Sequence, residues 1–155
     1  MAFVIKAVIQ IAYLNHYLTP PLFQKAEALF ARFLRPSPSV ELWKFYLTYV
    51  RRINANTTDP AIRDIVRKAY EFALVHVGQD TDAGQIWRDY IDFLKNSLDS
   101  RTTWDAQQKM DALRSAYHRA VVIPLDNVEA LWRELDAYEN GLNKITVRVP
   151  ARLSA

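Results

Sequence analysis

The sequence has 155 residues, enough for one domain with a hydrophobic core. It contains no cysteine, which excludes disulfides and thiolate metal sites, and only three glycines, which disfavours an all-β sandwich or a phosphate-binding loop. The net charge of +3 comes from residues 141–155, which hold three basic residues and no acidic one, so residues 1–140 contain 17 of each sign. A neutral body is poorly suited to sequence-independent binding of nucleic acid.

The N-terminal segment predicts a helix that does not cross a membrane. The apolar stretch from Met1 to Leu14 is interrupted by Lys6 and Gln10 and is shorter than a bilayer requires. Five of its apolar residues fall on one helical stripe: Val4, Ile5, Val8, Ile9 and Ala12. We therefore expect a helix here and no membrane association.

After this segment, proline, glycine and capping residues divide the chain at regular intervals. Six helices are predicted, each opened by a proline or a capping residue and each closed by a proline, a glycine or a polar loop. They run from Thr19 to about Arg35, from Ser37 to about Ile53, from Asp59 to Gly78, from Thr81 or Asp82 to about Asn96, from Thr102 or Thr103 to Pro124, and from Asp126 to about Asn140. No segment alternates convincingly with the period of two that is typical of a strand.

Three of these helices carry the same aromatic motif. Trp43, Trp87 and Trp132 are 44 and 45 residues apart. Each is followed, after three and six residues, by large apolar side chains on the same helix face: Tyr46 and Tyr49, Tyr90 and Phe93, and Leu135 and Tyr138. A single helical hairpin cannot bury such a face alone, so we expect neighbouring hairpins to bury all three tryptophans.

The helices between them carry a motif with small residues. Ala69-Tyr70-x-x-Ala73 recurs as Ala116-Tyr117-x-x-Ala120, and the segment 29–34 is a looser copy of it. Alanines four residues apart leave a groove into which a bulky neighbour can pack. The alternation of the two motifs predicts an all-α fold, an α-solenoid of antiparallel helix pairs. The alternative is an ordinary helix bundle in which the aromatic residues recur by chance.

A Trp-x-x-Tyr helix followed by an Ala-Tyr-x-x-Ala helix resembles the HAT repeat, a relative of the tetratricopeptide repeat (TPR) found in RNA-processing scaffolds. Four longer stretches, Glu41–Tyr46, Lys68–Gly78, Gly84–Lys95 and Gln108–Arg114, resemble the suppressor-of-forked family more specifically. This family is the HAT-repeat subunit of cleavage stimulation factor and of fungal cleavage factor IA. The resemblance covers about residues 22–146, and Leu142-Asn143-Lys144 resembles the fungal branch.

The resemblance implies a nuclear protein–protein scaffold for cleavage and polyadenylation of pre-mRNA 3′ ends. It implies other subunits of that machinery as partners, mostly indirect contact with RNA, and no catalytic site. Full-length relatives are longer and homodimerise through a second HAT block, which we expect to be absent here. We accordingly divide the chain into a divergent N-terminal helix (1–18), a HAT-repeat domain of about three helix pairs (19–146) and a divergent tail (147–155).

No residue pattern predicts an enzyme. His16, His76 and His118 lie far apart and lack the spacing of metal ligands. Asp89 and Asp92 lie among basic neighbours on one helix and are expected to be solvated charges instead of an acid/base pair. We expect no catalysis, no cofactor and no metal.

One cluster of cations is a possible partner or RNA surface: Arg51, Arg52, Arg63, Arg67 and Lys68. The alternative is a solvated face whose cations pair with Asp64 and Glu71. Three functions therefore remain open on the sequence: a scaffold in 3′-end processing, a HAT-repeat scaffold in another RNA pathway such as splicing, and direct RNA binding through this cluster.

Overall fold

A computed structural model of the chain describes residues 2–17, 23–35, 39–56, 58–96 and 102–147. Across these ranges the backbone forms seven α-helices, one short 3-10 helix and no strand. The helices are α1 (Ala2–Tyr17), α2 (Phe23–Leu34), α3 (Val40–Ile53), α4 (Pro60–Val77), η1 (Thr81–Ala83), α5 (Gly84–Lys95), α6 (Thr103–Val121) and α7 (Val128–Val147). The all-α expectation is confirmed.

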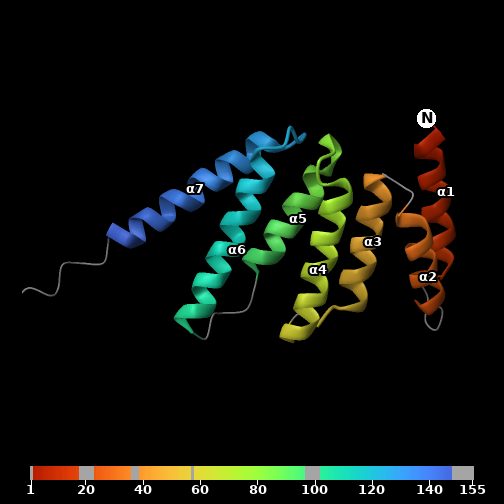
Figure 1. The fold of residues 1–155 in the computed structure, drawn as a ribbon, viewed down its shortest axis with the longest axis horizontal. Coiled ribbons are helices and arrows are strands. Elements are labelled where there is room, and N and C mark those ends of the chain that lie inside the picture. The colour runs from red at the N-terminus through yellow and green to blue at the C-terminus, as the bar shows by residue number, and fades with distance from the viewer. Residues whose placement is uncertain (1, 18–22, 36–38, 57, 97–101, 148–155) are drawn as a thin grey trace, which may run out of the picture.

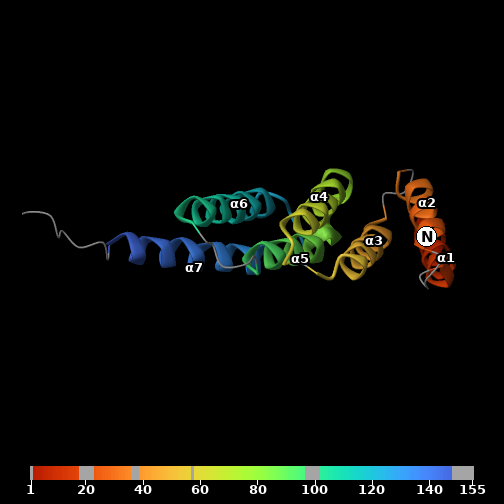
Figure 2. The ribbon, with the colours of Figure 1, turned by 90° about the horizontal axis from the view of Figure 1, so that it is seen from below.

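The helices follow one another in a row, from α1 and α2 at one end to α7 at the other (Figure 1). Seen from below, they form two layers, with α2, α4 and α6 on one side and α3, α5 and α7 on the other (Figure 2). Each helix contacts the next along the chain, and α1 also contacts α3. This is the α-solenoid of helix pairs that the repeated motifs predict.

Capping residues begin several helices where the sequence indicates. The Asp59 side chain accepts a hydrogen bond from the Ala61 amide (2.8 Å), with Pro60 in the first turn, and Thr102 accepts one from the Asp105 amide (3.1 Å). Such side chains satisfy amides that have no partner within the helix. The predicted starts at Thr19 and Ser37, and the predicted loop 97–101, lie outside the described residues, and Ser39 is the cap of α3.

Several predicted boundaries are wrong. Helix α6 ends at Val121, before Pro124, and α7 begins at Val128, after Asp126. Asp80, not Thr81 or Asp82, caps the start of the fourth predicted helix, and the first turn there is the 3-10 helix η1. The last helix does not end near Asn140 but continues through Gly141 to Val147. A glycine in an exposed helix interior costs only about 1 kcal/mol, which the flanking turns can offset.

The buried core contains most of the residues of the two motifs. Trp43 and Trp87 are 0% and 2% exposed, as expected. Tyr46 and Tyr138 are half-buried. The other buried motif residues are Tyr49, Ala69, Tyr70, Ala73, Tyr90, Phe93, Ala116, Tyr117, Ala120 and Leu135.

Trp132 contradicts the expectation, since it is 55% exposed. The two buried tryptophans show the reason, because each is covered by the helix that follows its own. The Trp43 ring stacks on His76 of α4 with 4.8 Å between ring centres, and the Arg119 guanidinium of α6 lies 5.2 Å from the centre of the Trp87 ring. Trp132 lies on α7, the last helix of the described chain, so no described helix covers it in the same way.

The apolar stripe of α1 points away from the other helices. Ile5, Val8 and Ile9 are about 60% exposed, whereas Ala7 and Leu14 on the opposite side are buried. None of the described helices is long and apolar enough to span a membrane.

Candidate functional site

The five cations that the sequence groups together do not form one free basic patch. The Arg63 guanidinium reaches from α4 to the C-terminal end of α5, where it donates to the carbonyl oxygens of Phe93 (3.3 Å) and Asn96 (3.4 Å). It also lies 4.7 Å from the centre of the Phe93 ring, and burial lowers its pKa. A cation at a helix C-terminus satisfies carbonyls that the helix leaves unpaired. Arg63 therefore joins two helix pairs.

Arg67 and Lys68 share the carboxylate of Asp64. Arg67 Nη2 and Lys68 Nζ each lie 2.6 Å from an oxygen of Asp64. Hydrogen bonds from Lys68, and next from Arg67, lower the pKa of Asp64. Arg51 donates a long hydrogen bond (3.5 Å) to the Tyr70 hydroxyl, and Arg52 is exposed. The expected pairing with Asp64 is confirmed.

Glu71 connects helix α4 to helix α6. It accepts hydrogen bonds from Arg119 Nη1 (2.8 Å) and Nη2 (3.0 Å), and a third from the Tyr90 hydroxyl (2.7 Å). Burial raises the pKa of Glu71, but the hydrogen bonds from Arg119 and Tyr90 outweigh this effect, so that the net pKa is lowered. A bidentate arginine–carboxylate pair is geometrically specific. It therefore fixes the distance and register between α4 and α6.

Glu134 on α7 has a similar role at the next interface. Its carboxylate accepts hydrogen bonds from Arg88 (2.6 Å) and Lys95 (3.1 Å) of α5 and from the Tyr117 hydroxyl (3.1 Å) of α6. Burial raises the pKa of Glu134, but hydrogen bonds and charge from Lys95, together with its other donors, lower it overall. One carboxylate thus joins three helices.

Ring contacts show which positions are equivalent from one repeat to the next. The Tyr70 ring of α4 packs on Tyr90 and Phe93 of α5, with 5.3 and 5.7 Å between ring centres. Phe30 of α2 contacts the equivalent pair, Tyr46 (5.3 Å) and Tyr49 (5.0 Å) of α3, although its ring meets Tyr46 edge-on. Phe30 is therefore the counterpart of Tyr70, which confirms the segment 29–34 as a copy of the motif that begins at Ala69.

The same alignment places Ala31 opposite Glu71, and Phe72 opposite Arg119. The two residues that join α4 to α6 thus have an alanine and a phenylalanine as their counterparts between α2 and α4. The consequence is an apolar hollow of about 510 Å³, which we call the α2–α4 groove. Its lining includes Phe30, Ala31, Leu34, Tyr46, Ile65 and Phe72.

Two tyrosines and one glutamate are among the polar side chains that line the α2–α4 groove. The Tyr49 hydroxyl donates to Glu27 (3.4 Å), and burial together with the charge of Glu27 raises the pKa of Tyr49 to about 12. Burial and, next, Glu27 also raise the pKa of Tyr46. Among the described residues the Tyr46 hydroxyl makes no hydrogen bond, whereas its counterpart Tyr90 donates to Glu71. Tyr46 therefore offers an unused donor and acceptor on the wall of the groove.

Two of the histidines lie in separate surroundings on different helices. His76 stacks on Trp43, and His118 lies 4.0 Å from Glu139. In the part of the chain that the structure describes, no group of three or more His, Cys, Asp or Glu residues could hold a metal ion.

Comparison with known proteins identifies the family of the chain. A family model described as Suppressor of forked protein (Suf) matches residues 1–151. The chain belongs to the suppressor of forked family. It is 44% identical over 143 residues to the mRNA 3′-end-processing protein rna-14 of Neurospora crassa, a match that covers 90% of this chain and 12% of that protein.

Other relatives of this suppressor of forked chain carry similar names. The mRNA 3′-end-processing proteins rna14 of Schizosaccharomyces pombe and RNA14 of Yarrowia lipolytica are 42% and 40% identical to it. The matches cover 81% and 93% of this chain but only 17% and 18% of those proteins, so the chain spans less than a fifth of their length. The crystal structure of CstF-77 matches 90% of this chain and 28% of its own with a TM-score of 0.70 at 24% identity, which shows a shared fold.

Sequence reasoning missed the residues that connect the suppressor of forked repeats to one another. It assigned Glu71 to the basic cluster, whereas its ion pair is with Arg119. It did not single out Glu134 or the contrast between Ala31 and Glu71. Aligning the sequences of α2, α4 and α6 position by position would have revealed that contrast, because α2 has an alanine at the position where α4 has a glutamate.

Proposed function

We propose that this chain is part of a protein–protein interaction scaffold for the cleavage and polyadenylation of pre-mRNA 3′ ends. It acts in the nucleus, together with other subunits of the processing machinery, and it has no catalytic activity of its own. The observation that carries the proposal is the match of 90% of the chain to a protein named for mRNA 3′-end processing. The solenoid supports it, since stacked helix pairs present an extended surface for partners.

The ion pairs and hydrogen bonds of the basic cluster favour protein partners over direct RNA binding. Arg63 caps α5, and Arg67 and Lys68 share one carboxylate. With the hydrogen bond from Arg51 to Tyr70, four of the five cations already have protein partners. Contacts with RNA phosphates need cations that are free to displace the counterions bound to the nucleic acid. We therefore propose that RNA reaches the assembly mainly through other subunits.

An affinity purification tests this function. The tagged chain is incubated with nuclear extract from a filamentous fungus, treated with ribonuclease, washed and analysed by mass spectrometry. We expect subunits of the cleavage and polyadenylation machinery to remain bound after the ribonuclease step. Their absence would refute the scaffold function, and their loss on ribonuclease treatment would favour direct RNA binding. Recovery of splicing factors in their place would favour a scaffold in that pathway.

We also propose that the chain alone lacks the homodimerisation of longer family members. Size-exclusion chromatography with light scattering measures its mass directly. A discrete dimer at micromolar concentration would contradict this part of the proposal.

A further inference from the structure

The α2–α4 groove has the size and lining of a site for partner side chains. Its volume of about 510 Å³ lies within the range of about 300–1,000 Å³ that is typical of ligand sites. Ile65 and Phe72 line it and are 51% and 42% exposed, although both are large apolar residues. Because exposed apolar side chains that surround a hollow favour binding over solvation, the groove is suited to an apolar partner surface.

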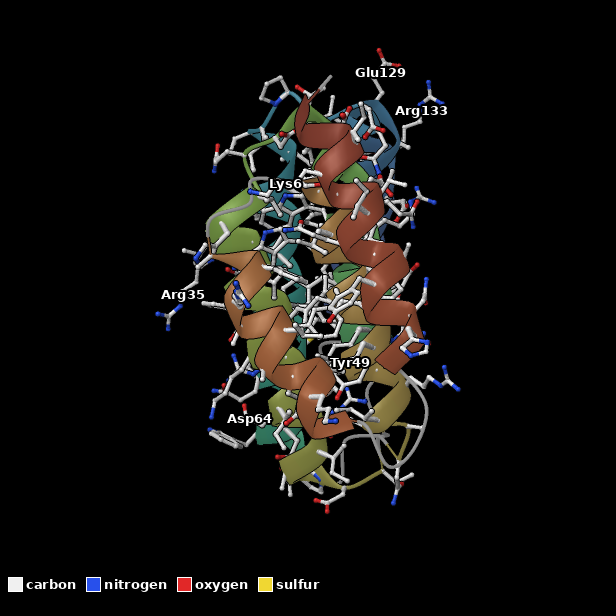
Figure 3. All side chains as sticks on the ribbon, turned by 90° about the vertical axis from the view of Figure 1, so that its right-hand side faces the viewer. Lys6, Arg35, Tyr49, Asp64, Glu129 and Arg133 are labelled. Carbon is white, nitrogen blue, oxygen red and sulfur yellow. The ribbon has the colours of Figure 1, made fainter. Side chains whose placement is uncertain are left out.

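The charged side chains that line the groove are two cations, Arg35 and Lys68, and one anion, Glu27. Residues 1–77 contain 10 basic and 5 acidic side chains, whereas residues 78–140 contain 7 basic and 12 acidic. The groove lies in the basic half. Arg35 and Lys68 belong to its lining, and no ion pair of Arg35 is found among the described residues. Arg35 projects outward on the side of the molecule on which Asp64 also lies, while Tyr49 lies inside (Figure 3).

The geometry of the groove favours a helix as its occupant. Its walls are helices, which expose no row of unpaired backbone groups to which an extended peptide could add as a strand. Ala31 of α2 and Ala69 of α4 are small, so a third helix can approach closely with its side chains between those of the walls. An RNA strand would need a continuous basic track beside stacking rings, whereas Leu34 and Ile65 are aliphatic and Lys68 is already paired with Asp64.

We propose that the α2–α4 groove binds an amphipathic helix of a partner protein, with the apolar face of that helix in the groove and its acidic residues against Arg35. The inference rests on the proposed function, because it assumes that the chain is a protein scaffold, and it names the chemistry of one partner. The Tyr46 hydroxyl supplies a hydrogen bond to the bound helix. The ion pair that joins α4 to α6 occupies the equivalent place in the next repeat, so that interface does not offer the same site.

The double variant Ala31→Glu/Phe72→Arg tests the proposal by copying the Glu71–Arg119 pair into the groove. An arginine at position 72 can lie over Trp43 as Arg119 lies over Trp87, so we expect this variant to fold. The matched control Ala28→Glu/Val75→Arg introduces the same two charges at exposed positions of α2 and α4 that do not line the groove. Circular dichroism and thermal melting establish that both variants are folded.

The probes are three synthetic peptides of roughly 18 residues, about five helical turns. One has a leucine and phenylalanine stripe with glutamates on its flanks, the second has lysines in place of the glutamates, and the third is a scrambled acidic sequence. A single-stranded RNA oligonucleotide is the fourth probe. Fluorescence anisotropy of labelled probes measures each affinity at two salt concentrations.

We expect the acidic amphipathic peptide to bind more tightly than the basic and scrambled peptides. Ala31→Glu/Phe72→Arg should weaken this binding by about tenfold or more, as loss of a central apolar anchor does, and the control by less than about twofold. Should the first variant not fold, Arg35→Glu serves in its place, because Arg35 is exposed. It should abolish the preference for the acidic over the basic peptide.

Three results would overturn the inference. These are no binding of the acidic peptide, equal effects of the groove and control variants, or an RNA affinity that exceeds that of the peptide and falls steeply with salt. Repeating the nuclear purification with the groove variant separates this inference from the proposed function. If the groove variant does not bind the acidic peptide but retains every processing subunit, the groove assignment fails and the scaffold function stands.

Discussion

Replacing Trp43 and Trp132 by alanine compares a tryptophan buried between two helices with its counterpart on the exposed face of α7. Trp43 is 0% exposed, and its ring meets Phe72 at 5.3 Å and His76 at 4.8 Å. A fully buried indole removes about 150–250 Å² from water, which at about 25 cal/mol per Å² amounts to about 4–6 kcal/mol. We expect Trp43→Ala to lower the free energy of unfolding by about 3–5 kcal/mol.

Trp132 retains 55% of its exposure, so less than half of that area is buried. Trp132→Ala should therefore lower the free energy of unfolding by no more than about 2 kcal/mol, because burial relative to an extended chain is an upper bound. For a chain of this length each kcal/mol shifts the melting temperature by about 2–4 °C. The two variants should differ by at least about 1 kcal/mol and therefore in melting temperature by at least about 2 °C.

Urea titration followed by far-ultraviolet circular dichroism measures the two free energies, and thermal melts provide the second comparison. Trp43→Phe is the control that retains an aromatic ring of smaller size, and it should fall between the wild type and Trp43→Ala. Equal destabilisation by Trp43→Ala and Trp132→Ala would refute the explanation that the following helix shields the indole. The same is true of a Trp43→Ala variant within about 1 kcal/mol of the wild type.

Three further predictions concern helix connections and glycines. Hydrogen bonds from Arg119 and Tyr90 outweigh burial and lower the pKa of Glu71 below its ordinary 4.5, so its ion pair stabilises the fold above that pH and is lost in acid. Glu71→Gln should therefore lower the free energy of unfolding by about 1 kcal/mol near neutral pH and by less near pH 4. An equal cost at both pH values would contradict this. Arg63→Ala should lower the free energy of unfolding, measured by urea titration, by about 1–2 kcal/mol, because the carbonyls of Phe93 and Asn96 lose a donor. A cost equal to that of Arg52→Ala would show that this contact is dispensable. Gly84→Val should cost about 1–3 kcal/mol, because a side chain there meets the side chains of Asp126 and Asn127. Gly141→Ala, with open space around it, should gain about 0.5–1 kcal/mol. A rise in melting temperature for Gly84→Val would contradict the first assignment, and a fall for Gly141→Ala the second.

Much of the fold could be predicted because the signals for helix pairs are local. Asp59 and Thr102 begin helices through hydrogen bonds to amides two and three residues away, and no distant residue is needed for that. The spacing of Trp43 and Trp87 predicted their burial for a similar reason, since each is covered by the next helix along the chain. The helix through Gly141 could not be predicted from its glycine, since the cost of one glycine is small beside that of the whole helix.

The candidate site depended on contacts between residues far apart in the sequence. Arg119 and Glu71 are 48 residues apart and meet only because α6 lies beside α4. The sequence alone offers Glu71 the cations of the basic cluster as partners, as one of two alternatives for that cluster. A side chain that can reach several neighbours pairs with the one that packing brings nearest, and sequence spacing does not contain that distance.

Residues that are near one another or that repeat are enough to predict the helical periodicity, the alternation of aromatic and small-residue helices, and membership of the suppressor of forked family. The packing of the helices is needed to explain why Trp132 is exposed while Trp43 is buried. It is also needed to explain why Ala31 and Phe72 leave an apolar groove, whereas Glu71 and Arg119 join two helices in the next repeat. Burial and cavities are properties of the space between helices. The same motif residue can therefore be covered in one repeat and exposed in the next, according to which neighbour lies beside it.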